Sequence, residues 1–279
     1  MSGLYRVMDI VLPFSFLEYD FMKNALLAIL IITPLFAMLG TIIVNNKMAF
    51  FSDALGHSAY TGIAVGVICG VVDFSIPMIL FAVVYALCLN RIKRKRTIST
   101  DTVISVFASL GIALGLVILS KGGNFSKYSY LLIGDILSVT TKQILSLVLI
   151  FAIVLLFWGL FFNQLHALSI NESLARSKGY KVEVLDDIFA VLIAIVIMLS
   201  IQWVGSLIIN ALLIIPAAAS RNIARNVREY HWFAILISLF SGITGLVFSY
   251  INNTATGPTI VLTLAVVFFL SLAVKPVLK

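Results

Sequence analysis

Charge is what this sequence has least of. Asp, Glu, Lys and Arg together make up only 11% of its 279 residues, whereas soluble domains carry about 25%. Apolar residues make up 61%, and charge-free runs of roughly 20 residues, long enough to cross about 30 Å of hydrocarbon, recur along the chain. This composition excludes a soluble globular protein and predicts an all-α polytopic membrane protein.

Catalytic and nucleotide-binding motifs are also missing. The sequence has no G-x-x-x-x-G-K-[ST], H-E-x-x-H, C-x-x-C or G-x-S-x-G pattern, so a P-loop and several common hydrolase sites are excluded. The two cysteines, Cys69 and Cys88, lie in apolar runs without metal or redox spacing. We therefore expect packing roles for both cysteines, and we do not expect an enzyme.

Nine stretches are candidate membrane spans. The seventh is too short to cross comfortably, and the 33 uncharged residues from 188 to 220 exceed one helix without making two full ones. Gly205 and Pro216 offer break points, which predicts a helix followed by a short or partly re-entrant one. Nine crossings are the simplest count, and eight result if this pair merges. The stretches are residues 24–44, 50–72, 74–90, 102–119, 142–162, 188–205, 206–219, 232–250 and 258–274.

Basic residues predict the orientation of the chain. If the run RIKRKR at 91–96 is cytoplasmic, alternating spans place 14 of the 19 Lys and Arg residues on that side, as the positive-inside rule requires. The N-terminus is then outside and the C-terminus cytoplasmic. We interpret the net charge of +7 through this asymmetry and expect no nucleic-acid partner. The run itself is predicted to be a solvated anchor that also meets anionic membrane lipid.

An acid and an imidazole interrupt the second stretch. Asp53 and His57 are four residues apart, so on a helix they share one face, with Cβ atoms about 5–6 Å apart. Ionisable residues inside membranes usually face a bundle interior or a pathway, and imidazole and carboxylate suit zinc and manganese. The alternative is that Asp53, with Ser52, caps the helix start and His57 is hydrogen-bonded in the core. The other histidines, His166 and His231, are predicted to be solvated in cytoplasmic connections.

Other polar residues have local interpretations. Asn171 to Ser173 followed by Gly179 predict a helix cap, one or two turns and a glycine stop, a short helix exposed to the cytoplasm; a solvated linker is the alternative. Asp135 is predicted to cap a helix or bond within a loop rather than to bind a metal. Gln202 and Asn210 are expected to form hydrogen bonds between helices.

Three motifs carry a family resemblance. MAFFSDALGHSAYTGIAVG (Met48 to Gly66), NESLARSKGY (Asn171 to Tyr180) and VGSLIINALLIIPAAASR (Val204 to Arg221) resemble segments of the membrane permeases of bacterial zinc and manganese ATP-binding cassette importers. The motifs follow the order found in that family, and the similarity covers residues 21–274. The second motif also resembles the segment by which the related vitamin B12 and siderophore permeases meet their ATPase.

The resemblance implies an architecture and partners. It implies a type II ABC importer permease-like bundle, with residues 1–279 forming a single transmembrane permease domain and a cytoplasmic coupling segment at about 166–186. It also implies a homodimer or a pair of paralogues in the bacterial plasma membrane, served by cytoplasmic ATPases that hydrolyse ATP and by an extracellular metal-binding protein. No permanently bound cofactor is expected, since Zn²⁺ or Mn²⁺ would be the transported substrate.

The resemblance also assigns roles to residues. It implies that Asp53 and His57 contact the metal. Gly56, Tyr60 and Thr61 depart from the residues common in the family, which leaves zinc, manganese and iron open as substrates, with a slight preference for zinc from the histidine. Contacts with the ATPase are implied for Glu172, Ser173, Leu174, Ala175, Arg176 and Gly179.

Two other functions are compatible with parts of the sequence. A proton-coupled secondary metal transporter would also use an Asp and a His in a membrane helix, but it would typically show repeated halves and further intramembrane carboxylates. An intramembrane aspartyl protease would pair Tyr19-Asp20 with a Gly-x-Gly-Asp motif. However, Asp20 precedes the first span, and the first glycine of that motif is replaced by Leu132.

Overall fold

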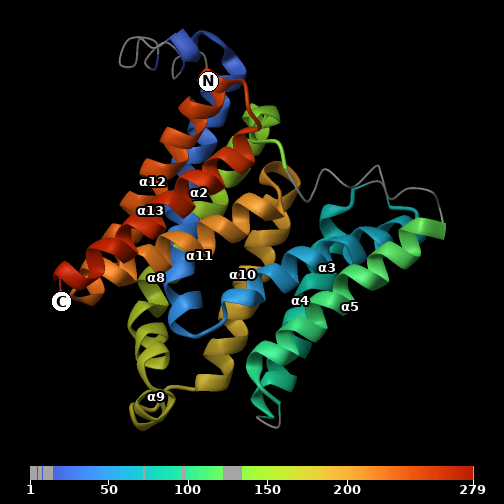
Figure 1. Cartoon of the computed structure of the whole chain (residues 1–279). Helices are drawn as coiled ribbons and strands as arrows, with labels where there is room; N and C mark the ends of the chain where they lie inside the picture. Colours follow the sequence, from blue (N-terminus) through green and yellow to red (C-terminus); the bar gives the residue numbers. More distant parts are fainter. Residues whose placement is uncertain are drawn as a thin grey trace. The chain divides into compact units, whose positions relative to one another are not determined.

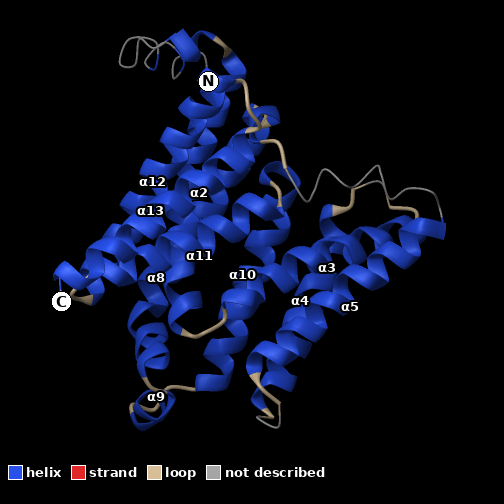
Figure 2. Cartoon of the chain, in the orientation of Figure 1, coloured by secondary structure: helices blue, strands red, loops and turns tan. Residues whose placement is uncertain are grey.

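The computed structural model describes Tyr5, Met8 and residues 15–71, 73–95, 98–121 and 134–278, with side chains up to Lys275. Helices dominate this part of the chain, which contains no β-strand (Figure 2). The nine long helices are α2 (Asp20–Asn45), α3 (Ala49–Ile68), α4 (Ser75–Arg94), α5 (Thr100–Lys121), α8 (Thr141–Ile170), α10 (Val182–Val204), α11 (Ser206–Ile223), α12 (Val227–Asn252) and α13 (Thr256–Leu278). The described residues also form three short helices, η1 (Ser15–Glu18), η2 (Ile136–Ser138) and α9 (Glu172–Ser177) (Figure 1).

Each of these nine helices corresponds to one of the nine predicted spans. Eight of them are long and apolar enough to cross a membrane. The ninth is α3, whose 20 residues also measure about 30 Å, but Asp53, His57 and several small polar residues lower its hydropathy. The prediction of an all-α polytopic fold with eight or nine membrane helices is therefore confirmed.

The break between α10 and α11 lies at Gly205. This glycine has φ 85°, a conformation that L side chains rarely adopt, and α11 begins directly after it. Pro216, by contrast, lies inside α11 without ending it, so the second expected break is wrong. Membrane helices tolerate proline because neighbouring groups satisfy the freed carbonyl, and α11 runs for 18 residues.

The chain divides into two compact units, residues 1–41, 133–159 and 203–279, and residues 42–132 and 160–202. In the first unit α11 packs against α12 and α13. Hydrogen bonds tie α12 to α2: the Ser238 hydroxyl donates to the carbonyl of Thr33 at 3.0 Å, and the Tyr230 hydroxyl donates to that of Thr41 at 3.2 Å. The hydroxyls of Ser238 and Tyr230 are thus satisfied by a neighbouring helix rather than by water.

Two histidines are buried rather than solvated. His231 lies 2.9 Å from the Thr41 hydroxyl through Nδ1 and packs edge-on against Trp158. His166 packs edge-on against Phe162, and both histidines are less than 10% exposed. The prediction of solvated roles is wrong because α8 and α12 extend several residues beyond the apolar stretches from which their ends were predicted.

Glycines bring α3 close to its neighbours in the second unit. A Cβ added to Gly115 of α5 would lie 2.6 Å from the backbone of Tyr60, and one added to Gly62 of α3 would lie 2.7 Å from the Cα of Met78 in α4. The Thr61 hydroxyl donates to the carbonyl of Gly111 across the same α3–α5 contact. Small residues allow such approach in membranes, where helices associate largely through packing and hydrogen bonds.

Replacing Gly115 with alanine should therefore destabilise the protein. The new methyl group would overlap the backbone of Tyr60, and relief requires α3 and α5 to separate. Thermal unfolding of the purified protein in detergent should begin at a lower temperature.

Gly159→Ala is the matched control. This glycine is also helical, and an added Cβ would meet nothing within 4 Å, so the unfolding temperature should stay the same or rise, since alanine favours a helix over glycine by about 0.5–1 kcal/mol. Equal unfolding temperatures for the two variants would contradict the close α3–α5 contact.

Candidate functional site

Asp53 and His57 lie on a narrow uncovered stripe of α3. Thirteen of the helix's 20 residues are buried, but the side chains of Asp53 and His57 remain 44% and 28% exposed. Nε2 of His57 lies 3.5 Å from Oδ2 of Asp53. The predicted helical juxtaposition is therefore present, and the pair is neither sealed in the core nor fully exposed.

The capping interpretation of this pair is wrong. The residue at the N-cap of α3 is Met48, and Asp53 lies more than a turn inside the helix. The Ser52 hydroxyl donates to the carbonyl of Ala49 at 3.2 Å within the same helix. Nδ1 of His57 is buried without a hydrogen-bond partner among the described residues, so its imidazole is not fully satisfied by the surrounding helices.

The pair can coordinate a cation, but only incompletely. A carboxylate oxygen and an imidazole nitrogen are suitable donors for divalent transition metals, and a tetrahedral site needs four donors. The described part of the chain has no group of three or more His, Cys, Asp or Glu residues that could hold a metal ion. One copy of the chain therefore contributes half of a tetrahedral site at most.

The short helix α9 has the predicted cap and stop. The Asn171 side chain accepts a hydrogen bond from the backbone N–H of Ser173 at 2.8 Å, and Gly179, at φ 79°, follows the helix. Arg176 pairs with Glu172 one turn earlier at 2.9 Å. This hydrogen bond, with a weaker one to Glu183, raises the pKa of the Arg176 guanidinium.

The residues of α9 divide into an anchor and an exposed face. Ala175 is fully buried against Ala167 and Val182, with Leu168 and Tyr180 around them. Leu174, by contrast, is 42% exposed, although it is a large apolar residue. Ala175 therefore fixes the helix to its own unit. The exposed face consists of Ser173, Leu174, Arg176, Ser177, Lys178 and Gly179.

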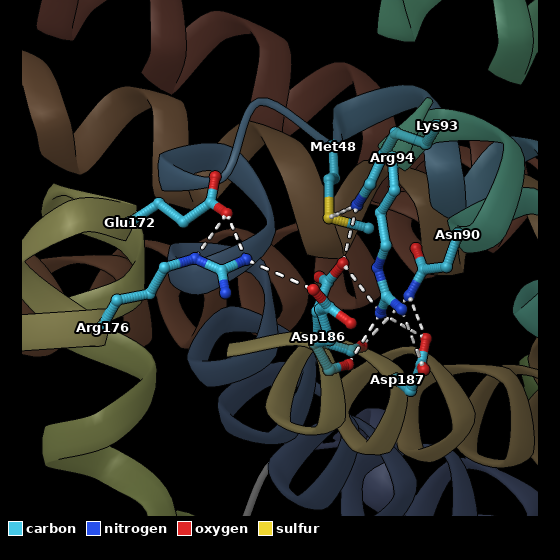
Figure 3. Close-up of polar contacts among 9 residues, drawn as sticks. Met48, Asn90, Lys93, Arg94, Glu172, Arg176, Asp186 and Asp187 are labelled. Atoms are coloured by element: carbon cyan, nitrogen blue, oxygen red, sulfur yellow. Dashed lines mark hydrogen bonds and ion pairs between the residues drawn. The ribbon is translucent and has the colours of Figure 1, made fainter. Parts of the chain in front are cut away.

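An ion-pair cluster joins the ends of α4 and α10 (Figure 3). Arg94 forms a two-pronged pair with Asp187, with distances of 2.6 and 3.2 Å. Lys93 lies 3.2 Å from Asp186, and both of these side chains are only 15% exposed. Asn90 donates to Asp187 at 3.3 Å. The described residues of the basic run are therefore not all solvated anchors as predicted, because acids of α10 neutralise two of them; Arg96 lies outside the described residues.

Sequence reasoning missed this cluster, although a signal was present. Asp186 and Asp187 lie in the second turn of α10, and the basic run lies at the end of α4, both on the predicted cytoplasmic side. A cavity of about 720 Å³ lies beside the cluster and α9. It is lined by Asn45, Asn46, Lys47, Met48, Lys93, Arg94, Thr100, Leu168, Ser169, Glu172, Arg176, Val182, Glu183 and Asp186.

Two further predictions are confirmed. The Asp135 carboxylate caps η2 by accepting a hydrogen bond from the backbone N–H of Leu137 at 3.0 Å. The Gln202 amide of α10 donates to the Ser75 hydroxyl of α4 at 3.1 Å. Both side chains are thus engaged in holding the fold.

Eight membrane-length helices in the described part of the chain define a polytopic membrane protein, and the family to which the chain belongs makes it a transport permease. The chain belongs to the ABC 3 transport family, whose model matches residues 18–275. This assignment decides against the secondary transporter and the intramembrane protease, and it identifies a permease rather than an enzyme.

Known proteins resemble nearly the whole chain. It is 32% identical over 256 residues to the high-affinity zinc uptake system membrane protein ZnuB of Haemophilus influenzae, covering 91% of this chain and 97% of that one. It is 29% identical to the manganese import system permease protein ScaB of Streptococcus gordonii, over 93% of each. The solved structure of PsaBC from Streptococcus pneumoniae in complex with Fab matches with a TM-score of 0.79 and 28% identity, over 97% of this chain and 95% of that one. The protein is therefore a multi-pass protein of the bacterial inner membrane with an ABC permease fold.

Asp186→Ala should lower stability strongly. Removing this carboxylate leaves Lys93 largely buried without its counter-ion, and breaking a buried pair from one side costs about 3–5 kcal/mol. Thermal unfolding in detergent should therefore occur at a clearly lower temperature.

Glu172→Ala is the control, because it breaks an ion pair that is roughly half exposed. Such pairs contribute about 0–1 kcal/mol, so its unfolding temperature should stay close to that of the unmodified protein. A larger effect from Glu172→Ala than from Asp186→Ala would contradict the burial of the α4–α10 cluster.

Proposed function

We propose that this chain is the translocation subunit of an ATP-driven importer of a divalent transition metal, zinc or manganese. The observation that carries the proposal is the position of Asp53 and His57, together on the uncovered stripe of an otherwise enclosed helix. Relatives whose names include zinc uptake and manganese import give the substrate class. An ATPase in the cytoplasm and a metal-binding protein outside would complete the system.

The uncovered stripe favours a second copy of the chain as its neighbour. A charged side chain facing hydrocarbon is costly, up to about 2.5–3.5 kcal/mol at the centre of a membrane helix. Asp53 is the fifth of the 20 residues of α3, inside the helix, so lipid is an unfavourable neighbour for it. Two chains meeting at α3 would remove the pair from lipid and bring two carboxylates and two imidazoles together. A homodimer, or a pair of paralogues, would then form a four-donor site.

A sparse donor set suits passage of an ion better than storage. Conduction requires an ion to bind well enough to lose water and weakly enough to leave. Two side chains per copy, held at 3.5 Å from each other, provide donors without a closed cage. Imidazole suits zinc and carboxylate suits manganese, and uptake measured with each metal in a strain lacking its own importers would identify the substrate.

The conformational change of the ATPases would be transmitted to the permease through α9. With the basic residues inside, the connection that contains α9 is cytoplasmic, the N-terminus is outside and the C-terminus is inside. Leu174 and the polar residues around it would fit a groove on the ATPase, while Ala175 holds the helix in place from behind. Closure of the ATPases on nucleotide would then move the permease as rigid bodies between outward-open and inward-open arrangements.

Asp53→Ala and His57→Ala should each abolish metal uptake while the complex still assembles. Loss of a group that merely supports a metal ligand lowers metal affinity about 10–100-fold, and loss of a ligand itself should lower uptake by at least that much. Uptake of radioactive zinc or manganese into proteoliposomes containing the whole complex measures the effect. Co-purification of the ATPase reports assembly.

Asp101→Ala is the control for these variants. Asp101 is an exposed acid in the first turn of another helix, α5, and its loss should leave uptake unchanged. Normal uptake by either the Asp53 or the His57 variant would refute the pathway role. Uptake driven by a proton gradient without any ATPase would favour a secondary transporter instead.

Leu174→Asp should release the ATPase. A carboxylate in place of this exposed leucine would have to be desolvated in the groove of the partner, so less ATPase should co-purify with the tagged permease. Val227→Asp is the matched control, because Val227 is 45% exposed and is the first residue of α12, at a helix end on the same predicted side. If both variants retained the ATPase equally, α9 would not be part of the surface that binds the ATPase.

A further inference from the structure

A continuous chain of polar contacts runs from α9 through α10 to α4. Nη2 of Arg176 on α9 lies 3.5 Å from Oε1 of Glu183 on α10. The backbone carbonyl of Glu183 accepts a hydrogen bond from Nη2 of Arg94 on α4 at 2.7 Å. Arg94 also holds Asp187 through two hydrogen bonds (Figure 3). Two arginines on different helices thus contact the first two turns of α10.

A second connection runs from this cluster to the start of α3. The Lys93 ammonium, paired with Asp186, lies 3.5 Å from Sδ of Met48, the N-cap residue of α3. Further along, Gly62 and Gly66 let α3 press against Met78, Phe74 and Pro77 at the other end of α4. The helix that carries Asp53 and His57 is therefore fixed to α4 at both of its ends.

The strongest ion pairs in this series of contacts, between α4 and α10, are partly shielded from solvent. The side chains of Arg94 and Asp187 are 26% and 28% exposed, and those of Lys93 and Asp186 are 15% exposed. Pairs of this kind are screened by salt much less than exposed ones, and the two-pronged Arg94–Asp187 geometry fixes orientation as well as distance. The outer link from Arg176 to Glu183 is exposed and weaker, and the burial of Ala175 against Val182 supports it.

We propose that Arg94 and Asp187 are positioning residues for transport, because they make α9, α10, α4 and α3 move as one body when the ATPase closes. Neither residue contacts the metal. Their role is to transmit a displacement of α9 to α3, the helix that carries Asp53 and His57. This inference rests on the proposed function, since it assumes that α9 meets the ATPase and that α3 lines the pathway.

Arg94→Ala and Asp187→Asn should uncouple ATP hydrolysis from transport. In proteoliposomes with the whole complex, the ATPase should remain bound and ATP hydrolysis should continue, while the metal transported per ATP falls at least about fivefold, the lower end of typical coupling between sites. The double variant should be no worse than either single variant, because both remove the same link. Additive losses would overturn the shared role.

Arg91→Ala is the matched control. Arg91 belongs to the same basic run, one turn earlier on α4, and is exposed, so its loss removes the same charge without touching the chain of contacts. Metal transported per ATP should then match the unmodified complex. If Arg94→Ala and Asp187→Asn also match it, the inference is wrong. If the unmodified complex transports neither metal, the proposed function fails, and the distance measurement below still tests the mechanical link.

Spin labels on α9 and α4 test the link directly. Ser177 and Val84 are exposed label sites on these helices, and Cys69 and Cys88, free and exposed, would first be replaced by serine. With labelled chains diluted in unlabelled ones, the distance between the labels should be narrowly distributed and unchanged by nucleotide. In the Arg94→Ala background it should broaden and change with nucleotide. A nucleotide-dependent change with Arg94 intact would overturn the proposal.

Discussion

The cost of placing a polar group in hydrocarbon governs this protein. Side-chain hydroxyls in the described part of the chain repeatedly donate to carbonyls of other helices, as Ser238 does to Thr33 and Tyr85 does to Phe107. Buried charges at the helix ends are paired with opposite ones, as Lys93 is with Asp186. Against this background Asp53 and His57 stand out, because their polar atoms are only partly covered by their own chain.

Close packing of α3 against its neighbours fixes the orientation in which Asp53 and His57 are exposed. Within lipid, helices gain little from the hydrophobic effect and associate through packing and hydrogen bonds, so glycines at the α3 contacts determine how firmly α3 is held. Gly62 and Gly66 of α3 allow α4 to approach closely, and Gly111 and Gly115 of α5 allow α3 to approach closely. A helix enclosed in this way presents Asp53 and His57 at a defined orientation, as the proposed metal site would require.

Charge has a second use at the ends of the helices. Basic residues there favour one orientation of a membrane chain, and in this protein two of them, Lys93 and Arg94, also pair with acids in the second turn of α10. The side chains that predict the orientation of the chain therefore also join α4 to α10 through ion pairs. The mixed charges around the cavity beside α9 are largely balanced by these pairs, which favours a structural role for the cluster over capture of a free ion.

Local features were determined by the sequence alone. Hydropathy located the nine long helices, the four-residue spacing placed Asp53 and His57 on one helical face, and Asn171 and Gly179 marked the limits of α9, because each depends on neighbours within a turn or two. The tertiary structure alone decided which stripe of α3 stays uncovered, that Ala175 is buried, and that Arg94 pairs with a residue 93 positions away. Those outcomes depend on which helices pack together, and apolar periodicity carries little information about that choice.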